Sequence, residues 1–524
     1  MPKCTINGQE VEVKAGATIM EAFYQLKEPI AHYCYHPGLS VAGVCRLCIV
    51  DIEGNPRPQI ACNTVVTDGM KITNKSLKIE EGVKWVLDFH LINHPLDCPI
   101  CDQAGECGLQ DQYMQFGKYS SEMAEPKVKK HKVVDLGPTV VLDSERCILC
   151  ARCVRFTDEV SKTHELGLFN RGDRTEVGTF DGKPLDNKYS LNTVDICPVG
   201  ALTSKDFRFR QRVWYLKDSD TICTGCSTGC NVKVYYNKEG AFRVKPNYNE
   251  QVNGHWMCDE GRDIYKFVNR EHRLLKARKK QGGQWTELEA GAGAKDAAQV
   301  IKSTSAEGLA IVLTGQYTTE EYETLLKNFK TKKVYHWKNR PEKWNEFDGL
   351  LLRGDKNPNT NGLLKAAKAH GALAEMAELE SGLRSGAIAT VVVAGPENQA
   401  VYPDLKDKVK MLSQAKNVIW LSSCGSEALD QLGGNVWLIP MKSYIEKSGS
   451  FINHAGLEQH FKRATTIVSQ ALTLADASYL LTGQNIPIES VSEKDAFIET
   501  NRRPDQVMLE HRKKNEFVFK RGSL

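Results

Sequence analysis

The sequence has 524 residues, enough for three to five domains that each bury their own core. Its formal net charge is only +4, which argues against binding to nucleic acid through the phosphate backbone. Mean hydropathy is −0.40 and no run of about eighteen apolar residues occurs, so we expect no membrane-spanning helix. The N-terminal segment has neither the apolar core of a signal peptide nor the Arg/Ser bias of a transit peptide, which predicts a cytosolic chain.

Cysteine is the most informative residue type. Of the 17 cysteines, all but Cys424 lie at or before Cys258. Grouped thiols in a reducing compartment indicate metal ligands, whereas a disulfide-bonded secreted protein would be smaller and would carry a signal peptide. We therefore expect a series of metal clusters in the first half of the chain, and we interpret Cys424 as a packed residue.

Residues 1–78 have the pattern of a small β-rich domain. Asn7-Gly8 predicts a hairpin, and Thr18 is a candidate N-cap for a helix that ends at Leu26. Four cysteines spaced C-x10-C-x2-C-x13-C are candidate [2Fe–2S] ligands, in a domain that resembles a plant-type ferredoxin: Cys34, Cys45, Cys48 and Cys62. Structural zinc is the alternative, and a Rieske centre is disfavoured because Cys48 stands where a second histidine is required.

Residues 79–119 contain a predicted helix over 80–91 and then a loop with one imidazole and three thiols. The spacing is H-x3-C-x2-C-x5-C, and the candidate ligands of a first [4Fe–4S] cluster are His94, Cys98, Cys101 and Cys107. A zinc ion is again the alternative. Imidazole in place of thiolate removes one negative charge, so this site is expected to differ electrostatically from an all-cysteine site.

Two further cysteine sets follow. Residues 120–216 contain C-x2-C-x2-C and a distant Cys-Pro, which predict a second [4Fe–4S] cluster on Cys147, Cys150, Cys153 and Cys197. Residues 217–272 contain C-x2-C-x3-C-x27-C, which predicts a third on Cys223, Cys226, Cys230 and Cys258, with a zinc ribbon as the alternative. Arg152 and Arg155 either offset cluster charge or are plain surface residues, and the basic segment 127–132 is expected to be a solvated linker face.

From residue 273 to 524 the pattern changes to α/β alternation. Apolar runs at 308–315, 347–353, 389–395 and 417–421 predict buried strands of a mostly parallel sheet, and 319–329 is a predicted helix. The run Gly291-Ala-Gly293 lacks the third glycine of a dinucleotide site and follows no strand, so it is interpreted as a helix start.

The cluster motifs resemble a known family. Residues 94–111, 147–156 and 195–203 are similar to the large iron–sulfur subunit of respiratory complex I, which is the G or 75-kDa-type subunit of NADH:quinone oxidoreductase. Residues 220–270 and 446–459 resemble molybdopterin oxidoreductases. The implied fold class is α+β multidomain: a β-grasp [2Fe–2S] domain, a [4Fe–4S] domain with one histidine and three cysteine ligands, a ferredoxin-like [4Fe–4S] domain, the fourth cluster domain, and a shortened α/β molybdopterin-oxidoreductase-like region.

The resemblance implies an electron-transfer subunit without catalytic residues of its own. Electrons are expected to pass from a flavin- and NADH-binding partner to the [2Fe–2S] cluster, the Cys147 cube and the His94 cube, and then toward quinone-side iron–sulfur subunits. The fourth cluster is expected to lie off this route, and the C-terminal region is expected to hold no molybdopterin. The resemblance also implies that the whole complex couples the reaction to ion translocation.

The expected location is peripheral, on the cytoplasmic side of a bacterial inner membrane, with membrane contact only through partner subunits. Two alternatives come from other classes. One is the iron–sulfur subunit of an NAD-linked hydrogenase or formate dehydrogenase, and the other is a scaffold protein stapled by zinc.

Overall fold

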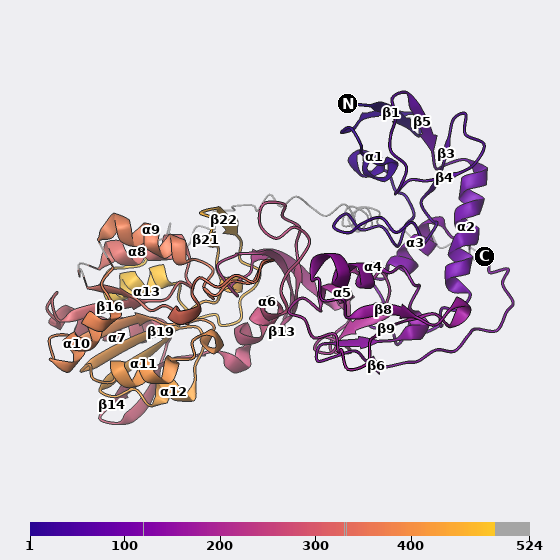
Figure 1. Cartoon of the computed structure of the whole chain (residues 1–524). Helices are drawn as coiled ribbons and strands as arrows, with labels where there is room; N and C mark the ends of the chain where they lie inside the picture. The colour runs from indigo at the N-terminus through magenta and orange to yellow at the C-terminus, as the bar shows by residue number, and fades with distance from the viewer. Residues whose placement is uncertain (119, 330, 332, 372, 488–524) are drawn as a thin grey trace, which may run out of the picture. The chain divides into compact units, whose positions relative to one another are not determined.

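The computed structural model describes residues 1–118, 120–329, 331, 333–371 and 373–487, and these fall into two compact units, one made of residues 1–215 and the other of residues 216–487 (Figure 1). The end of the predicted fifth domain, 488–524, lies outside the described residues. Within the described ranges, no helix is both long and apolar enough to cross a membrane.

The first unit begins with a five-stranded sheet in the order β2-β1-β5-β3-β4, in which β1 and β5 are parallel. Its strands are β1 (Lys3–Ile6), β2 (Gln9–Glu12), β3 (Ile49–Ile52), β4 (Gln59–Ile60) and β5 (Met70–Thr73). Before α1 (Ile19–Leu26), the Thr18 hydroxyl accepts from the Glu21 N–H while the Glu21 carboxylate accepts from the Thr18 N–H at 2.7 Å. This reciprocal capping box fixes the helix start and confirms the predicted N-cap. The antiparallel pairing of β1 with β2 confirms the predicted hairpin.

The rest of the first unit packs three cysteine loops onto one apolar core. Its helices are α2 (Leu77–Leu91), α3 (Gly108–Phe116), α4 (Arg152–Arg155), which continues into a π-helical turn, and α5 (Asn192–Ile196). Its strands are β6 (Val134–Asp135), β7 (Val140–Leu142), β8 (Leu166–Phe169), β9 (Glu176–Thr179) and β10 (Leu202–Ser204). The core joins Val83 and Leu87 of α2 to Cys34, Cys107 and Cys150, so candidate ligands from three loops lie over the same packed interior.

The second unit contains a small antiparallel sheet and a larger mixed one. The small sheet is β11 (Lys217–Ile222), β12 (Asn231–Asn237) and β13 (Gly240–Pro246), followed by α6 (Asp259–Arg262). The large sheet has the order β15-β14-β20-β19-β18-β16-β17, with antiparallel pairing only at β14 and β15. Its strands are β14 (Ala277–Gln281), β15 (Gln284–Leu288), β16 (Leu309–Leu313), β17 (Val334–His336), β18 (Thr390–Ala394), β19 (Asn417–Ser422) and β20 (Asn435–Pro440).

Helices cover both faces of this sheet (Figure 1). Along β16, Ile311 and Leu313 face one apolar core while Ala310 and Val312 face the other, as the two-residue period of a strand requires. One core takes residues from α7 (Ala290–Ser303), α8 (Thr319–Asn328), α9 (Thr360–His370) and α13 (Leu474–Leu481). The other takes residues from α10 (Met376–Arg384), α11 (Leu405–Leu412) and α12 (Glu427–Asp430). The hairpin of β21 (Gly449–Ile452) and β22 (Glu458–Phe461) completes the described part of the unit.

One predicted strand is wrong. Residues 347–353 form an irregular loop with a single bridge between Phe347 and Arg353. The Asp348 carboxylate accepts the N–H groups of Leu350, Leu351 and Leu352 at 3.0, 3.1 and 3.0 Å. Because the Asp348 side chain accepts these three consecutive donors, they are not available to pair with a neighbouring strand, which explains the error. By contrast, the helix predicted at 319–329 and the helix start at Gly291-Ala-Gly293 are confirmed by α8 and α7. The expectation that no strand precedes this glycine run is wrong, because β15 ends at Leu288, shortly before α7 begins at Ala290.

Candidate metal centres

The first cysteine set lies in the loop between α1 and β3 and just after β4. Side-chain hydrogen bonds pair Cys34 with Cys45 and Cys48 with Cys62, and none of the four is more than 5% exposed. The hydrogen bond from Cys45 lowers the pKa of Cys34 to about 5. The main-chain N–H of Tyr33 also donates to the Cys45 sulfur at 3.4 Å. Four buried thiols with N–H donors to sulfur fit the ligands of an anionic cluster.

The histidine set lies on the loop between α2 and α3. Within the described residues, His94 Nδ1 is buried and has no hydrogen-bond partner. Burial, Lys127 and Arg146 lower the pKa of His94 to about 4, so its ring is neutral near pH 7. A neutral imidazole with a free ring nitrogen has the form that ligates a metal. Burial, with a smaller contribution from nearby Cys101, raises the pKa of Cys107 to about 12.

The third set surrounds a small apolar cavity at the start of α4. All four candidate ligands line it: Cys147, Cys150, Cys153 and Cys197. Leu149 and Ala151, which flank Cys150, have φ values of 55° and 56°, in the left-handed region. This unusual backbone turns the Leu149 N–H toward the Cys147 sulfur, 3.4 Å away. The cavity and the aimed donor fit a group bound among the four sulfurs.

These three sets lie next to one another within the first unit. The Gly108 N–H donates to the Pro198 carbonyl at 2.8 Å, which joins the histidine loop to the Cys-Pro segment of the third set. A Cβ added to Gly200 would lie 2.3 Å from the Cys101 sulfur, so the two loops are in close contact. Ionised Cys34 raises the pKa of Cys150, which places the first and third sets within electrostatic reach of each other.

The fourth set lies in the second unit, between β11 and α6, and its members are buried: Cys223, Cys226, Cys230 and Cys258. The Cys223 N–H donates to the Cys230 carbonyl at 2.8 Å, and the Gly261 N–H donates to the Cys258 sulfur at 3.3 Å. Each thiol of the set is an electrostatic neighbour of at least one other. Over the ranges that the structure describes, no group of three or more His, Cys, Asp or Glu side chains has the spacing for a single metal ion.

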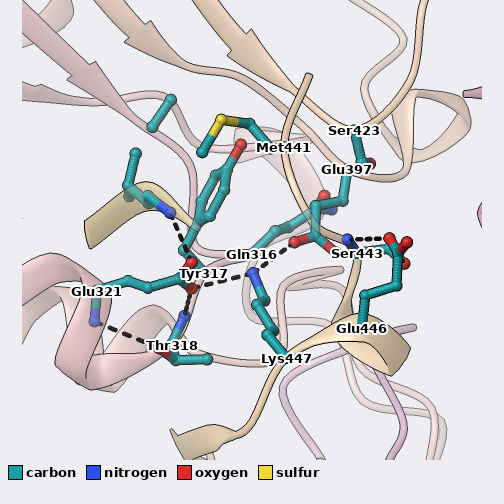
Figure 2. A network of polar contacts seen from close by, with 12 residues as sticks. Gln316, Tyr317, Thr318, Glu321, Glu397, Ser423, Met441, Ser443, Glu446 and Lys447 are labelled. Carbon is teal, nitrogen blue, oxygen red and sulfur yellow. Dashed lines mark hydrogen bonds and ion pairs between the residues drawn. The ribbon is translucent and has the colours of Figure 1, made fainter. Parts of the chain in front are cut away.

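Open α/β sheets commonly bind ligands at the carboxyl edge of the parallel strands, which in this sheet has its switch point between β16 and β18. Figure 2 shows Lys447 at this edge, between Glu321 and Glu397. Its Nζ lies 3.0 Å from Glu321 Oε2, 2.7 Å from Glu397 Oε1 and 4.8 Å from the Tyr317 ring centre. These side chains are buried, so the chain's own charges occupy the position where open α/β sheets bind ligands.

Beside this network, Arg273 and Glu446 form a second buried ion pair at 2.6 Å, with both side chains 0% exposed. The Glu446 carboxylate also accepts the N–H groups of Ser443, Ile467 and Val468 at 2.9, 2.7 and 2.7 Å. Burial raises the pKa of Glu446, but Arg273 and the backbone donors outweigh it and hold the pKa below its ordinary value. Cys424 is packed, as expected, with its thiol donating to the Phe267 carbonyl at 3.2 Å.

The charged residues around the candidate sites agree only in part with the expectations from the sequence. Arg152 is only 8% exposed, so the interpretation as a surface arginine is wrong for it. The segment 127–132 is largely exposed, as expected, but Lys132 forms an ion pair with Asp97 at 2.6 Å. Arg146, which was not predicted from the sequence, is 4% exposed and binds Asp97 at 2.9 Å. Its position directly before Cys147 is the feature of the sequence from which a role beside the third set could have been predicted.

Four family models match the chain. They are the "2Fe-2S iron-sulfur cluster binding domain" at 3–76, the "NADH-ubiquinone oxidoreductase-G iron-sulfur binding region" at 84–121, the "NADH-quinone oxidoreductase subunit 3, ferredoxin-like domain" at 137–203, and the "Molybdopterin oxidoreductase Fe4S4 domain" at 216–270. The chain therefore contains a 2Fe–2S domain and 4Fe–4S-binding regions.

Curated relatives carry matching names. The G subunit of NADH-quinone oxidoreductase from Rickettsia conorii is 36% identical over 63% of this chain and 49% of its own length. The NADH-ubiquinone oxidoreductase 75 kDa subunit of Reclinomonas americana is 41% identical over 53% of this chain and 40% of its own length. A solved NAD+-reducing [NiFe]-hydrogenase chain is 27% identical with a TM-score of 0.37, over 40% of this chain and 91% of that one. The chain spans about half the length of the curated relatives it matches.

Proposed function

Because the chain is a homologue of the iron–sulfur G subunit of NADH-quinone oxidoreductases, we propose that it is the electron-transfer subunit of such a complex. In this role it accepts electrons from a flavin- and NADH-binding partner and passes them toward quinone-side iron–sulfur subunits. The observation that carries the proposal is the contact between candidate ligand loops in the first unit, where members of three cysteine sets share one apolar core. Electron tunnelling falls off steeply with distance, so a relay needs centres held close together by rigid protein.

The proposed ligands are the four predicted sets: Cys34, Cys45, Cys48 and Cys62 for a [2Fe–2S] cluster, and His94, Cys98, Cys101 and Cys107, then Cys147, Cys150, Cys153 and Cys197, then Cys223, Cys226, Cys230 and Cys258 for three [4Fe–4S] clusters. Bound there, the clusters supply one-electron redox chemistry. The residues around them position the sulfurs and keep His94 neutral. The chain needs no general acid or base, because hydride chemistry belongs to the flavin of the partner.

We also propose that the α/β region is a scaffold without molybdopterin. The support is the buried network at the switch point, where Lys447 is neutralised by Glu321 and Glu397 of the same chain. A cofactor at this edge would have to displace these ion pairs, which would leave buried charges unpaired at high energetic cost. By this proposal the chain is peripheral on the cytoplasmic side of the membrane, held there by its partners, and the complex as a whole translocates ions.

Metal analysis of anaerobically purified chain tests the cluster assignment. We expect about fourteen iron atoms and negligible zinc per chain. Zinc at about four atoms per chain, with no visible absorbance from iron–sulfide bonds, would establish the zinc scaffold instead.

Activity in membranes that contain the assembled complex tests the electron-transfer role. Replacing Cys153 by serine should abolish NADH oxidation by quinone but preserve NADH oxidation by a soluble acceptor that takes electrons directly from the flavin. Unchanged quinone reduction in this variant would contradict the role. Reduction of NAD⁺ by hydrogen or formate in the purified complex would support the alternative subunit of a hydrogenase or formate dehydrogenase.

A further inference from the structure

Two arginines of α4, which lie on either side of Cys153 of the third cysteine set, bind main-chain carbonyls in the loop of the first set. Arg155 follows Cys153 by two residues, and its Nη2 donates to the Cys34 carbonyl and, at 3.4 Å, to the Cys150 carbonyl. Its Nη1 donates to the Ser40 carbonyl, and its Nε donates to the Ala151 carbonyl at 3.3 Å. One guanidinium therefore binds the main chain of one candidate ligand from each of two sets.

Arg152 spans the same two loops from the other side of Cys153. Its Nη1 donates to the Ile196 carbonyl at 3.1 Å, and its Nη2 donates to the Tyr35 carbonyl. Ile196 precedes Cys197 and Tyr35 follows Cys34, so this guanidinium also joins ligand-bearing segments of both sets. The positions joined lie 44 and 117 residues from Arg152 in the sequence.

A third contact closes the same junction. The Glu159 carboxylate, in the π-helical turn after α4, accepts the Ser40 N–H at 2.8 Å and the Ser40 hydroxyl. The loop of the first set is thus held to α4 and its extension at Cys34, Tyr35 and Ser40. A guanidinium presents five N–H donors in a fixed plane, which suits it to hold several carbonyls at once.

The charge of these arginines is as informative as their hydrogen bonds. Every hydrogen bond described for the two guanidinium groups goes to a neutral carbonyl, so these bonds position two positive charges between the loops without cancelling them. Arg155 binds the carbonyls of Cys34 and Cys150 themselves. Arg152 binds the carbonyls of Tyr35 and Ile196, which are next to Cys34 and Cys197 in the sequence. Both sets therefore lie in the field of these two cations.

We propose that Arg152 and Arg155 are positioning residues that hold the [2Fe–2S] centre and the Cys147 centre side by side and raise the reduction potentials of both. The inference rests on the proposed function, because it requires iron–sulfur clusters in the first and third sets. Reduction adds one electron, and hence one negative charge, to a cluster that is already anionic. A fixed cation nearby stabilises the reduced form, so removal of the cation lowers the potential.

The test is an electron paramagnetic resonance redox titration of the assembled complex with Arg155→Met. We expect the reduced-to-oxidised ratio at fixed potential to fall about tenfold for both centres, which for one electron is a shift of about 59 mV. The centres on the His94 and Cys223 sets should not shift. Arg155→Lys keeps the positive charge but loses the planar guanidinium group that binds several carbonyls at once. The reduction potentials of the two centres should therefore stay near wild type, while their two signals lose the magnetic broadening that each causes in the other. Arg174→Met, an exposed arginine of the same unit, is the matched control.

Unchanged potentials in Arg155→Met would overturn the proposal, and so would a shift at one of the two centres only. If Arg155→Met fails to assemble, Arg155→Lys and Arg152→Lys carry the test, and wild-type line shapes and relaxation in both would overturn the positioning role. A wild-type chain that lacks either centre would instead reject the proposed function, and this outcome is seen before any variant is made.

Discussion

Loss of the cation from the buried Arg273–Glu446 pair should destabilise the second unit severely. Arg273→Met leaves the Glu446 carboxylate, 0% exposed, without its ionic partner at 2.6 Å. It also removes the donors to the Ser423 carbonyl at 3.0 Å and to the Met441 carbonyl at 2.8 Å, which tie Arg273 to the ends of β19 and β20. Breaking one side of a buried ion pair typically costs about 3–5 kcal/mol.

Hydrogen exchange measured by mass spectrometry on the full chain shows which segments lose stability in the Arg273→Met variant. A loss of about 3–5 kcal/mol corresponds to a drop of two to more than three powers of ten in protection for β19 and β20 peptides. Peptides from the first unit should keep their protection. Lys276→Met is the matched control, because Lys276 and Glu287 form an exposed pair at 3.0 Å whose loss should leave protection unchanged.

A double-mutant cycle separates the pair from its surroundings. If the two charges stabilise each other, Arg273→Met with Glu446→Leu should be less destabilised than the sum of the single variants by at least about 1.5 kcal/mol. Additivity to within about 0.5 kcal/mol would refute the reasoning, because the cost would then come from lost packing and carbonyl contacts rather than from a stranded charge.

Three other predictions concern pH, the histidine ligand and the contact between loops. The pKa of Glu446 is lowered in the folded state, so the stability that its carboxylate contributes is present above its unfolded pKa of about 4.5 and is lost as pH falls through the folded pKa. Glu446→Gln should therefore show less exchange protection than wild type at pH 7, and this difference should narrow below about pH 4. A difference that stays constant with pH would contradict the sign of the pKa shift. His94→Ala should remove or alter one [4Fe–4S] signal and lower the iron content by up to about four atoms per chain while the other signals persist; an unchanged spectrum would reject His94 as a ligand. Gly200→Ala places a Cβ 2.3 Å from the Cys101 sulfur and should disturb the His94 centre most, whereas Gly291→Ala, with its nearest contact at 3.9 Å within α7, should leave every signal intact; equal spectra for the two variants would show that the loops have room to separate.

Much of the organisation of this chain could be predicted from local patterns. The hairpin at Asn7-Gly8, the capping box at Thr18 and the helix at 319–329 depend on residues a few positions apart, and all three are confirmed. The core of each candidate ligand set was predicted in the same way, because three of its members lie close together in the sequence. The last member of three of the sets lies farther along the chain, at Cys62, Cys197 and Cys258. The failure at 347–353 shows the limit, since an apolar run does not reveal that the Asp348 carboxylate takes the backbone donors.

The sequence by itself determined which thiols group together and that the second half alternates between helix and strand. Only the tertiary structure decided that Arg155 holds the carbonyl of Cys34, that Gly200 lies against Cys101, and that Lys447 pairs with Glu397 at the edge of the sheet. The physical reason is range. Ligand spacing and helix caps are set by neighbours in the chain, whereas buried charges and close contacts depend on partners that folding brings together from 50 to 121 residues away.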